Sequence, residues 1–169
     1  MSLQTQVSQL AFPKVNGHEL SRTSTDLAVG TLPVVGWTEL NFKWSRAPGK
    51  SYASRANPTA RTRGKVTYTA SLTVYETTWG VIYPYLTALG QAQGGVGPSE
   101  ASTPILLTYF EPSLFVGSKV IELQHAQFVE AEQAISDSDD QLVRKITLDI
   151  MGILEDGISP VTERGITGF

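Results

Sequence analysis

The residue types that most often carry catalysis are scarce in this chain and are not grouped. Its 169 residues include two histidines, His18 and His125, and no cysteine. Without cysteine, no disulfide, zinc-thiolate site or cysteine nucleophile can form. Neither histidine has a further ligand at metal-binding spacing, and the chain lacks a GxSxG or HExxH motif and any carboxylate pair set up for opposite protonation states. The sequence therefore predicts no enzyme activity, no metal site and no cofactor.

Three short motifs resemble ligand sites but lack essential parts. Gly49-Lys50-Ser51 ends like a phosphate-binding loop, but Trp44 stands where that motif requires its first glycine. The glycines of residues 90–97 are followed by no lysine-serine pair. The acidic run SDSDD at 136–140 lacks the central glycine and the distal glutamate of a calcium loop. We interpret this run as a solvated turn.

One segment concentrates positive charge. Residues 45–64, which we call the arm, contain five cations and no acidic residue. Like charges repel until a partner supplies counter-charge, so the arm is either a solvated, disordered loop or a segment that docks on an acidic surface outside its own subunit. The candidate residues for this contact are Arg46, Lys50, Tyr52, Arg55, Arg61 and Arg63.

The charges of the two halves of the chain have opposite signs. Residues 1–75 carry nine basic against three acidic residues, and residues 76–169 carry four basic against thirteen acidic residues, so the overall net charge is −3. A chain divided in this way can attract its own copies basic half to acidic half. Such a contact is head-to-tail and builds rings or filaments.

The arm must be positioned by the elements on either side of it. Residues 35–44 and 66–75 both alternate in the period-two pattern of strands with one buried face. In the first strand the alternation places Trp37 and Trp44 on opposite faces. Residues 75–89 then repeat apolar side chains at helical spacing, with a kink or late start expected at Pro84 and a helix end at Gly90.

The remainder of the chain predicts further strands within one domain. Strand-like runs cover 105–111, 118–124, 125–135 and 141–153, and the last run places Arg144 on its apolar face. A chain of this length forms one domain with a sizeable core, which we expect at 1–158, followed by a C-terminal tail at 159–169. No apolar run is long enough for a membrane helix and no secretory signal is present, so we expect folding in a cytoplasm.

Several weak motifs occur in a meaningful order. A VNG turn, the segment GWTELNFKWSRAPGK, RTRG followed by an alternating strand and a helix, and a late SDSDDQLVRKITLDI strand together span about 150 residues of the chain. In this order they resemble the inner tail tube protein of contractile-tailed bacteriophages, a family related to the haemolysin-coregulated proteins of type VI secretion. The resemblance does not distinguish a phage from a phage-derived bacteriocin or a secretion apparatus.

The resemblance implies a fold and an assembly. The expected fold is mainly β, an antiparallel β-sandwich or barrel of about seven or eight strands with one flanking α-helix and the long inter-strand arm. The implied function is a structural one: homohexameric rings that stack into the inner tail tube, the conduit for DNA or effector delivery inside a contractile sheath. The arm would contact the neighbouring subunit or ring, because open sheet edges and charged segments are sites of pairing.

The same resemblance implies partners and a lumen. The partners are further copies of the chain, the tail sheath protein, the baseplate and tail terminator proteins, and the tape measure protein and DNA in the lumen, without sequence-specific binding and without a membrane. The location is a virion tail assembled in the host bacterial cytoplasm. A neutral or acidic wall suits the passage of DNA, since each phosphate contact adds affinity. The candidate lumen residues are Glu122, Glu130, Glu132 and Asp149.

One alternative comes from a different class of protein. A monomeric β-sandwich binding module, for example a carbohydrate binder, would use Trp37, Trp44 and Tyr52 as stacking platforms. The predicted opposite faces of Trp37 and Trp44 argue against a shared platform. A small hydrolase, a third interpretation, lacks an identifiable nucleophile.

Overall fold

The computed structural model describes residues 25–52, 58, 60–61, 64–109, 119–133, 135 and 141–160. Within them, eight strands form one sheet in the order β2-β1-β7-β8-β9-β6-β3, with β10 also paired to β8, and every pairing is antiparallel. The fold is therefore mainly β with a flanking helix and an inter-strand arm, as the sequence predicted. The strands are β1 (Thr25–Val29), β2 (Leu32–Val34), β3 (Trp37–Ala47), β6 (Lys65–Tyr75), β7 (Ser102–Tyr109), β8 (Lys119–Gln133), β9 (Val143–Asp149) and β10 (Gly152–Glu155).

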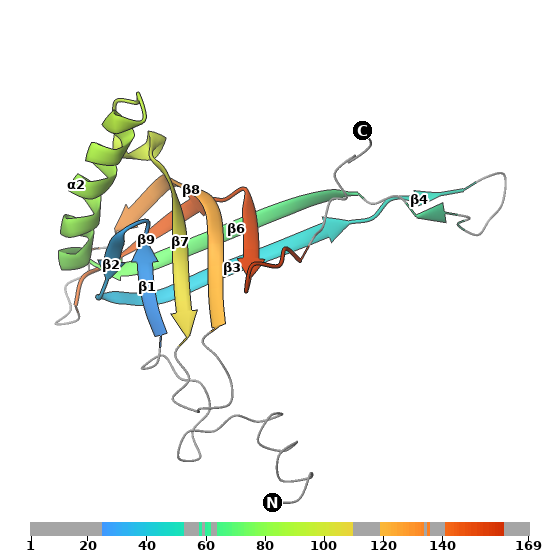
Figure 1. Cartoon of the computed structure of the whole chain (residues 1–169), viewed down its shortest axis with the longest axis horizontal. Helices are drawn as coiled ribbons and strands as arrows, with labels where there is room; N and C mark the ends of the chain where they lie inside the picture. Colours follow the sequence, from blue (N-terminus) through green and yellow to red (C-terminus); the bar gives the residue numbers. More distant parts are fainter. Residues whose placement is uncertain are drawn as a thin grey trace, which may run out of the picture.

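The sheet folds over on itself because β8 belongs to both of its halves. The first part of β8 pairs with β7 and β10, and its last part pairs with β9. Where these two parts of β8 meet, His125 has a positive φ of 50°, and the register with β7 shifts between Thr103 and Ile105. A bulge of this kind bends the strand. In Figure 1, β3 and β6 consequently pass behind β1 and β7 and continue beyond the body of the protein.

The alternation of apolar residues explains which face of each half is buried. Ala70, Leu72 and Val74 of β6 are buried, as the period-two pattern predicted. They face one apolar core that takes side chains from both halves of the sheet, among them Leu27, Val29, Ile105, Leu107, Ile121, Leu123, Phe128, Ile146, Leu148 and Ile153.

Helix α2 (Glu76–Ala92) closes one end of this core with Trp79, Ile82 and Leu86. It runs through Pro84 without a late start. The prediction that it ends at Gly90 is wrong. Gly94, with φ of 89°, is the left-handed residue, and the amides of Gly94 and Gly95 donate to the carbonyls of Gln91 and Gly90 in a Schellman motif. A 3-10 turn, η2 (Pro98–Glu100), then leads into β7.

Two polar contacts hold the flanks of α2. On one flank, Arg144 donates to both carboxylate oxygens of Glu76, at 3.0 and 2.9 Å. On the other, the Tyr85 hydroxyl accepts from the amide of Thr31 and lies 3.5 Å from the Thr31 hydroxyl. The Thr31 hydroxyl is the main reason that the pKa of Tyr85 lies below its usual value, and burial opposes it.

Several sequence predictions need correction at the level of single strands. The runs 118–124 and 125–135 form one continuous strand, β8, because a bulge rather than a turn separates them. The run 141–153 divides into β9 and β10 at Ile150-Met151. The predicted VNG turn and most of the tail at 159–169 lie outside the described residues. In the part of the chain that the structure describes, no helix is long and apolar enough to cross a membrane.

Candidate functional site

The base of the arm is an extension of strands β3 and β6 rather than a free loop. These strands pair without interruption from Glu39↔Thr73 to Ala47↔Lys65. Arg46 therefore lies inside β3. Figure 1 shows this two-stranded extension leaving the body on the side opposite α2, with β4 at its end.

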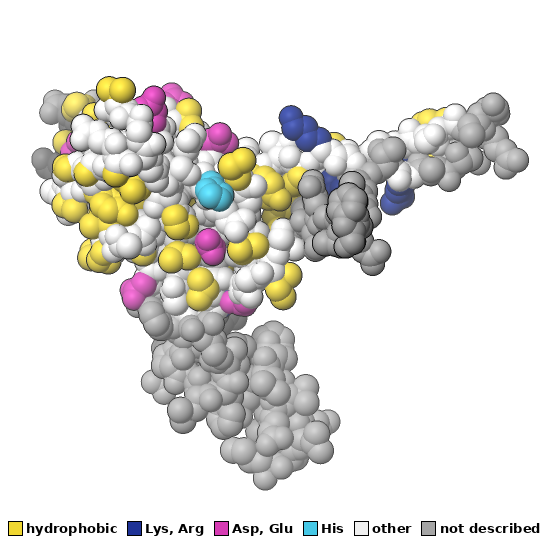
Figure 2. All heavy atoms as spheres, turned by 45° about the horizontal axis from the view of Figure 1, so that its top comes forward, with side chains coloured by type: hydrophobic (Ala, Val, Ile, Leu, Met, Phe, Trp, Pro, Cys, Tyr) yellow, Lys and Arg dark blue, Asp and Glu magenta, His cyan; other side chains and the backbone are white. Residues whose placement is uncertain are grey.

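The end of the arm is a short hairpin of β4 (Lys50–Ser51) and β5 (Ala60–Arg61). Lys50 and Arg61 lie opposite each other in its register, and both are exposed. Tyr52, which follows β4, is 56% exposed. Arg55 and Arg63 lie outside the described residues. Figure 2 shows basic side chains along this extension, whereas the acidic side chains visible in the view lie on the body.

A second surface is the face of β8, β9, β6 and β3 that points away from the core. The register places Asp149, Glu130 and Glu132 on it, together with Thr147 and Lys145. Three of the four candidate lumen residues are thus brought to one polar face. Glu122 lies in the first part of β8, between Leu106 of β7 and Leu154 of β10.

Hydroxyl side chains gather on this polar face. A shallow depression of about 460 Å³ is lined by hydroxyl and amide side chains and by two lysines. Its lining residues are Asn41, Phe42, Lys43, Thr69, Ala70, Ser71, Lys145 and Thr147. Sequence reasoning missed these hydroxyl residues, although the Thr/Ser alternation of 67–73 in the β6 pattern was the available signal.

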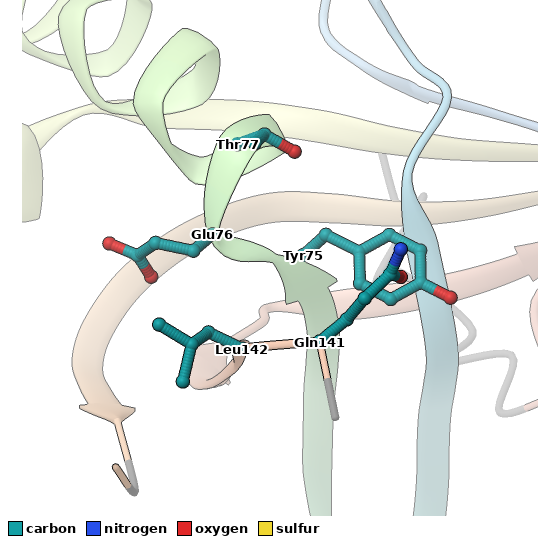
Figure 3. Close-up of a pocket in the computed structure, with 5 residues that line it drawn as sticks. All are labelled: Tyr75, Glu76, Thr77, Gln141 and Leu142. Carbon is teal, nitrogen blue, oxygen red and sulfur yellow. The ribbon is translucent and has the colours of Figure 1, made fainter. Parts of the chain in front are cut away.

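A second depression, of about 520 Å³, lies where α2 begins and is lined by Tyr75, Glu76, Thr77, Gln141 and Leu142. Figure 3 shows the Glu76 carboxylate and the Tyr75 ring on different sides of it. Among its described lining residues, Glu76 carries the one carboxylate, and Arg144 already donates to both of its oxygens. That carboxylate is therefore occupied as an acceptor and is poorly placed to act as a general base. No group of three or more metal-ligating side chains occurs among the described residues.

The proposed tryptophan platform requires a correction. The register of β3 shifts between Trp37 and Glu39, so Trp37 pairs with Val74 and Trp44 with Tyr68, on the same face of the sheet. The prediction of opposite faces is wrong because this bulge adds one residue to the alternation. The two rings are nevertheless about 20 Å apart along the strand, and Trp37 packs partly buried against the core.

Comparison with known proteins bears on the fold alone. No family model and no curated protein matches the sequence. Among solved structures, a chain of the anti-feeding prophage tube-terminating cap aligns with a TM-score of 0.62 at 11% identity, covering 86% of this chain and 95% of that one. A chain of the sheath-tube complex of the extracellular contractile injection system PVC aligns at 0.59 and 12%, covering 92% and 97%.

A chain of the SPP1 tail tube aligns with a TM-score of 0.55 at 8% identity, covering 80% of this chain and 78% of that chain. At identities this low, the structural alignments establish the arrangement of the backbone alone. That arrangement agrees with the fold that the order of the sequence motifs predicted. The chain therefore has the fold of tail tube proteins.

Proposed function

We propose that this chain is the structural subunit of a tail tube, whose copies close into hexameric rings through the edges of one four-stranded layer. The observation that carries the proposal is the layer β8-β9-β6-β3, which has a polar outer face and two outer edges. From Glu39 to Ser45, β3 pairs with β6 on one side and, within the described residues, with no strand on the other. Beyond Gln127, where the pairing with β7 ends, the last part of β8 pairs within the described residues with β9 alone. Exposed strand edges are templates for pairing with another chain.

The directions of the strands suit a closed ring. The four strands alternate in direction, so β3 and β8 run opposite ways. Rotation about a ring axis keeps every copy in the same orientation, and β8 of one copy then meets β3 of the next as an antiparallel pair. The wall of the ring becomes one continuous antiparallel sheet without free edges.

The polar face of this layer is the proposed lumen. It carries Glu130, Glu132 and Asp149 together with a band of hydroxyl groups. The basic residues at its described positions are lysines. Arginine binds phosphate through two parallel hydrogen bonds, and Arg46 and Arg144 project to the opposite side of the sheet in the register. A wall of this composition lets a polyanion pass with few lasting contacts. The cargo is DNA or an effector.

The arm is the proposed contact between stacked rings or neighbouring subunits. Its cations complement the acidic body of another copy, and its position at the end of the longest dimension lets it extend past its own subunit (Figure 1). The further proposed partners are the tail sheath, baseplate, tail terminator and tape measure proteins, in a tail assembled in a bacterial cytoplasm. This role is structural and needs no catalytic residue.

Light scattering and negative-stain microscopy of the purified chain, at low and moderate salt, test the proposal. We expect rings with six-fold symmetry or hollow tubes. A monomer of 18.3 kDa that persists at high concentration, also when tail initiator components are supplied, contradicts it. Screening for carbohydrate ligands then tests the alternative of a monomeric binding module.

A further inference from the structure

The outer edge of β3 exposes aromatic side chains on the side of the sheet away from the polar face. Leu40, Phe42 and Trp44 project to this side, opposite Leu72, Ala70 and Tyr68 of β6. Leu40 and Phe42 are partly buried against the core, and Trp44 is 42% exposed. A half-exposed tryptophan beside an open strand edge indicates a surface that gains from being covered.

Helix α2 presents an uncharged flank at the other edge of the layer. Glu76 is the only charged residue among its 17 positions, and that carboxylate is bound by Arg144. Tyr83, on the flank of α2 that holds Trp79, is 48% exposed. A helix in contact with water usually carries charged residues on its outer face, so the composition of α2 indicates a face that contacts protein.

Tyr83 belongs to the flank of α2 that lies beside β8. Its ring is 5.7 Å from the ring of Trp79, and Trp79 is 6.4 Å from Phe128 of β8. Arg144, which donates to Gln133 near the end of β8, covers the Trp79 ring at 5.5 Å. This aromatic group therefore stands directly behind the part of β8 whose outer edge has no strand beside it.

One row of the layer connects these two edges. Phe128 of β8, Leu148 of β9, Ala70 of β6 and Phe42 of β3 are successive register partners. Because the row begins and ends on an aromatic residue, joining β8 of one copy to β3 of the next brings Phe42 and Trp44 toward the neighbour's Phe128, Trp79 and Tyr83. The occupant of the uncharged α2 flank is then a second copy of this chain.

We propose that Phe42 and Trp44 of one copy pack against Tyr83 of the neighbouring copy, forming an aromatic seam behind the continuous sheet. The inference rests on the proposed ring, and it assigns the residues that supply the apolar part of the joint. Backbone pairing at the edges sets the strand direction, and the seam excludes water from the joint. Aromatic residues in such a position are typical binding hot spots.

The first experiment introduces charge on two flanks of the same helix. Tyr83→Glu is compared with Val81→Glu, since both side chains are exposed on α2 and neither change removes a core residue. We expect Tyr83→Glu to lower the fraction of chain in rings by about tenfold or more, while the unassembled chain still folds and unfolds in one cooperative thermal transition. Val81→Glu keeps the parent's ring content. Normal rings with Tyr83→Glu, or equal losses from both variants, overturn the seam.

The second experiment uses the absence of natural cysteine. A Trp44→Cys/Thr87→Cys chain, which keeps Phe42 and Tyr83, is assembled and treated with a short bismaleimide; Thr87 lies one turn after Tyr83 and donates to the Tyr83 carbonyl. A Trp44→Cys/Ala88→Cys chain is the control because Ala88 lies on the outward side of α2. We expect a ladder of covalent oligomers from the first pair only. Rings that form without this ladder overturn the seam and leave the tube function standing. A parent chain that forms no rings removes both proposals.

Discussion

Lys50 and Arg61 face each other across the two-stranded tip of the arm, as direct register partners. Like charges placed opposite each other destabilise a pair of strands, and a two-stranded hairpin is marginal even without them. A third chemical group that attracts both cations would offset this repulsion. Every copy of the chain carries acidic side chains on its body, away from its own arm (Figure 2). The body of a neighbouring copy can therefore supply that group.

Reversing one of these charges separates the stability of the hairpin from the function of the arm. Lys50→Glu creates an opposite-charge pair with Arg61 and strengthens the hairpin by about 0.2–1 kcal/mol, but it weakens contact with an acidic partner. We expect shorter tubes by negative-stain microscopy with an unchanged midpoint of urea unfolding. Lys119→Ala, outside the arm, is the control. Tubes of parental length contradict an electrostatic role of the arm.

Shortening the arm tests whether it contributes to stacking. Removal of residues 50–61 leaves the pair Ala47↔Lys65 joined by a connection of ordinary hairpin length. We expect the domain to fold and rings to form, because the β3 and β8 edges are intact, while long tubes disappear. The size distribution from analytical ultracentrifugation distinguishes rings from tubes. Long tubes in the shortened variant mean that stacking depends on other surfaces.

The salt dependence of assembly follows from the same charges. Raising ionic strength from about 0.05 to 1 M shortens the Debye length from above 10 Å to about 3 Å, which screens exposed charges. We expect tube formation to weaken across this range, as measured by light scattering at fixed concentration. The parent chain's thermal unfolding at both salt concentrations is the control. Assembly that is indifferent to salt indicates that apolar or main-chain contacts dominate.

Gly64 closes the base of the arm in a conformation that other residues rarely adopt. Its φ is 67°, and an added Cβ would lie 1.9 Å from the carbonyl oxygen of Ala47. We expect Gly64→Ala to destabilise this end of β3 and β6 by about 1–3 kcal/mol, with faster proteolysis of the arm. Gly80→Ala is the matched control, because nothing lies within 4 Å of its added Cβ. That change in a helix interior stabilises by about 0.5–1 kcal/mol.

The contact of Arg144 with Glu76 connects α2 to β9, and it positions the rings of Trp79 and Tyr83 behind β8. The two side chains are 21% and 36% exposed, and the contact is bidentate. We expect Arg144→Ala to lower the free energy of unfolding by about 1–3 kcal/mol, with Arg144→Lys intermediate because lysine cannot form both bonds. Urea unfolding of the unassembled chain measures both.

The exposed ion pair Lys119–Glu155 provides the comparison for that measurement. Its side chains are 45% and 44% exposed at 3.1 Å, so Lys119→Ala should change the free energy by less than about 0.5 kcal/mol. Equal effects of Arg144→Ala and Lys119→Ala contradict the assigned role of Arg144.

The sequence by itself determined the features that depend on local pattern and composition. The alternation from Val66 to Val74 predicted β6 as a strand with one buried face, because a strand projects successive side chains to opposite faces wherever it lies. The same rule placed Arg144 with Ile146 and Leu148. The arm's charge could be read directly, and so could the order of motifs that predicted the tail tube fold.

The tertiary structure alone decided the features that depend on pairing between distant segments. The bulge before Glu39 places Trp37 on the same face as Trp44, and it exists only in the register with β6. One added residue exchanges the two faces of a strand, so no local pattern could reveal it. The continuity of β8 through His125, and the edges it leaves open, likewise follow from its neighbours β7, β9 and β10. Local pattern therefore specified the strands and their alternating faces, and strand pairing decided where a bulge exchanges those faces and which strand edges and aromatic residues are exposed.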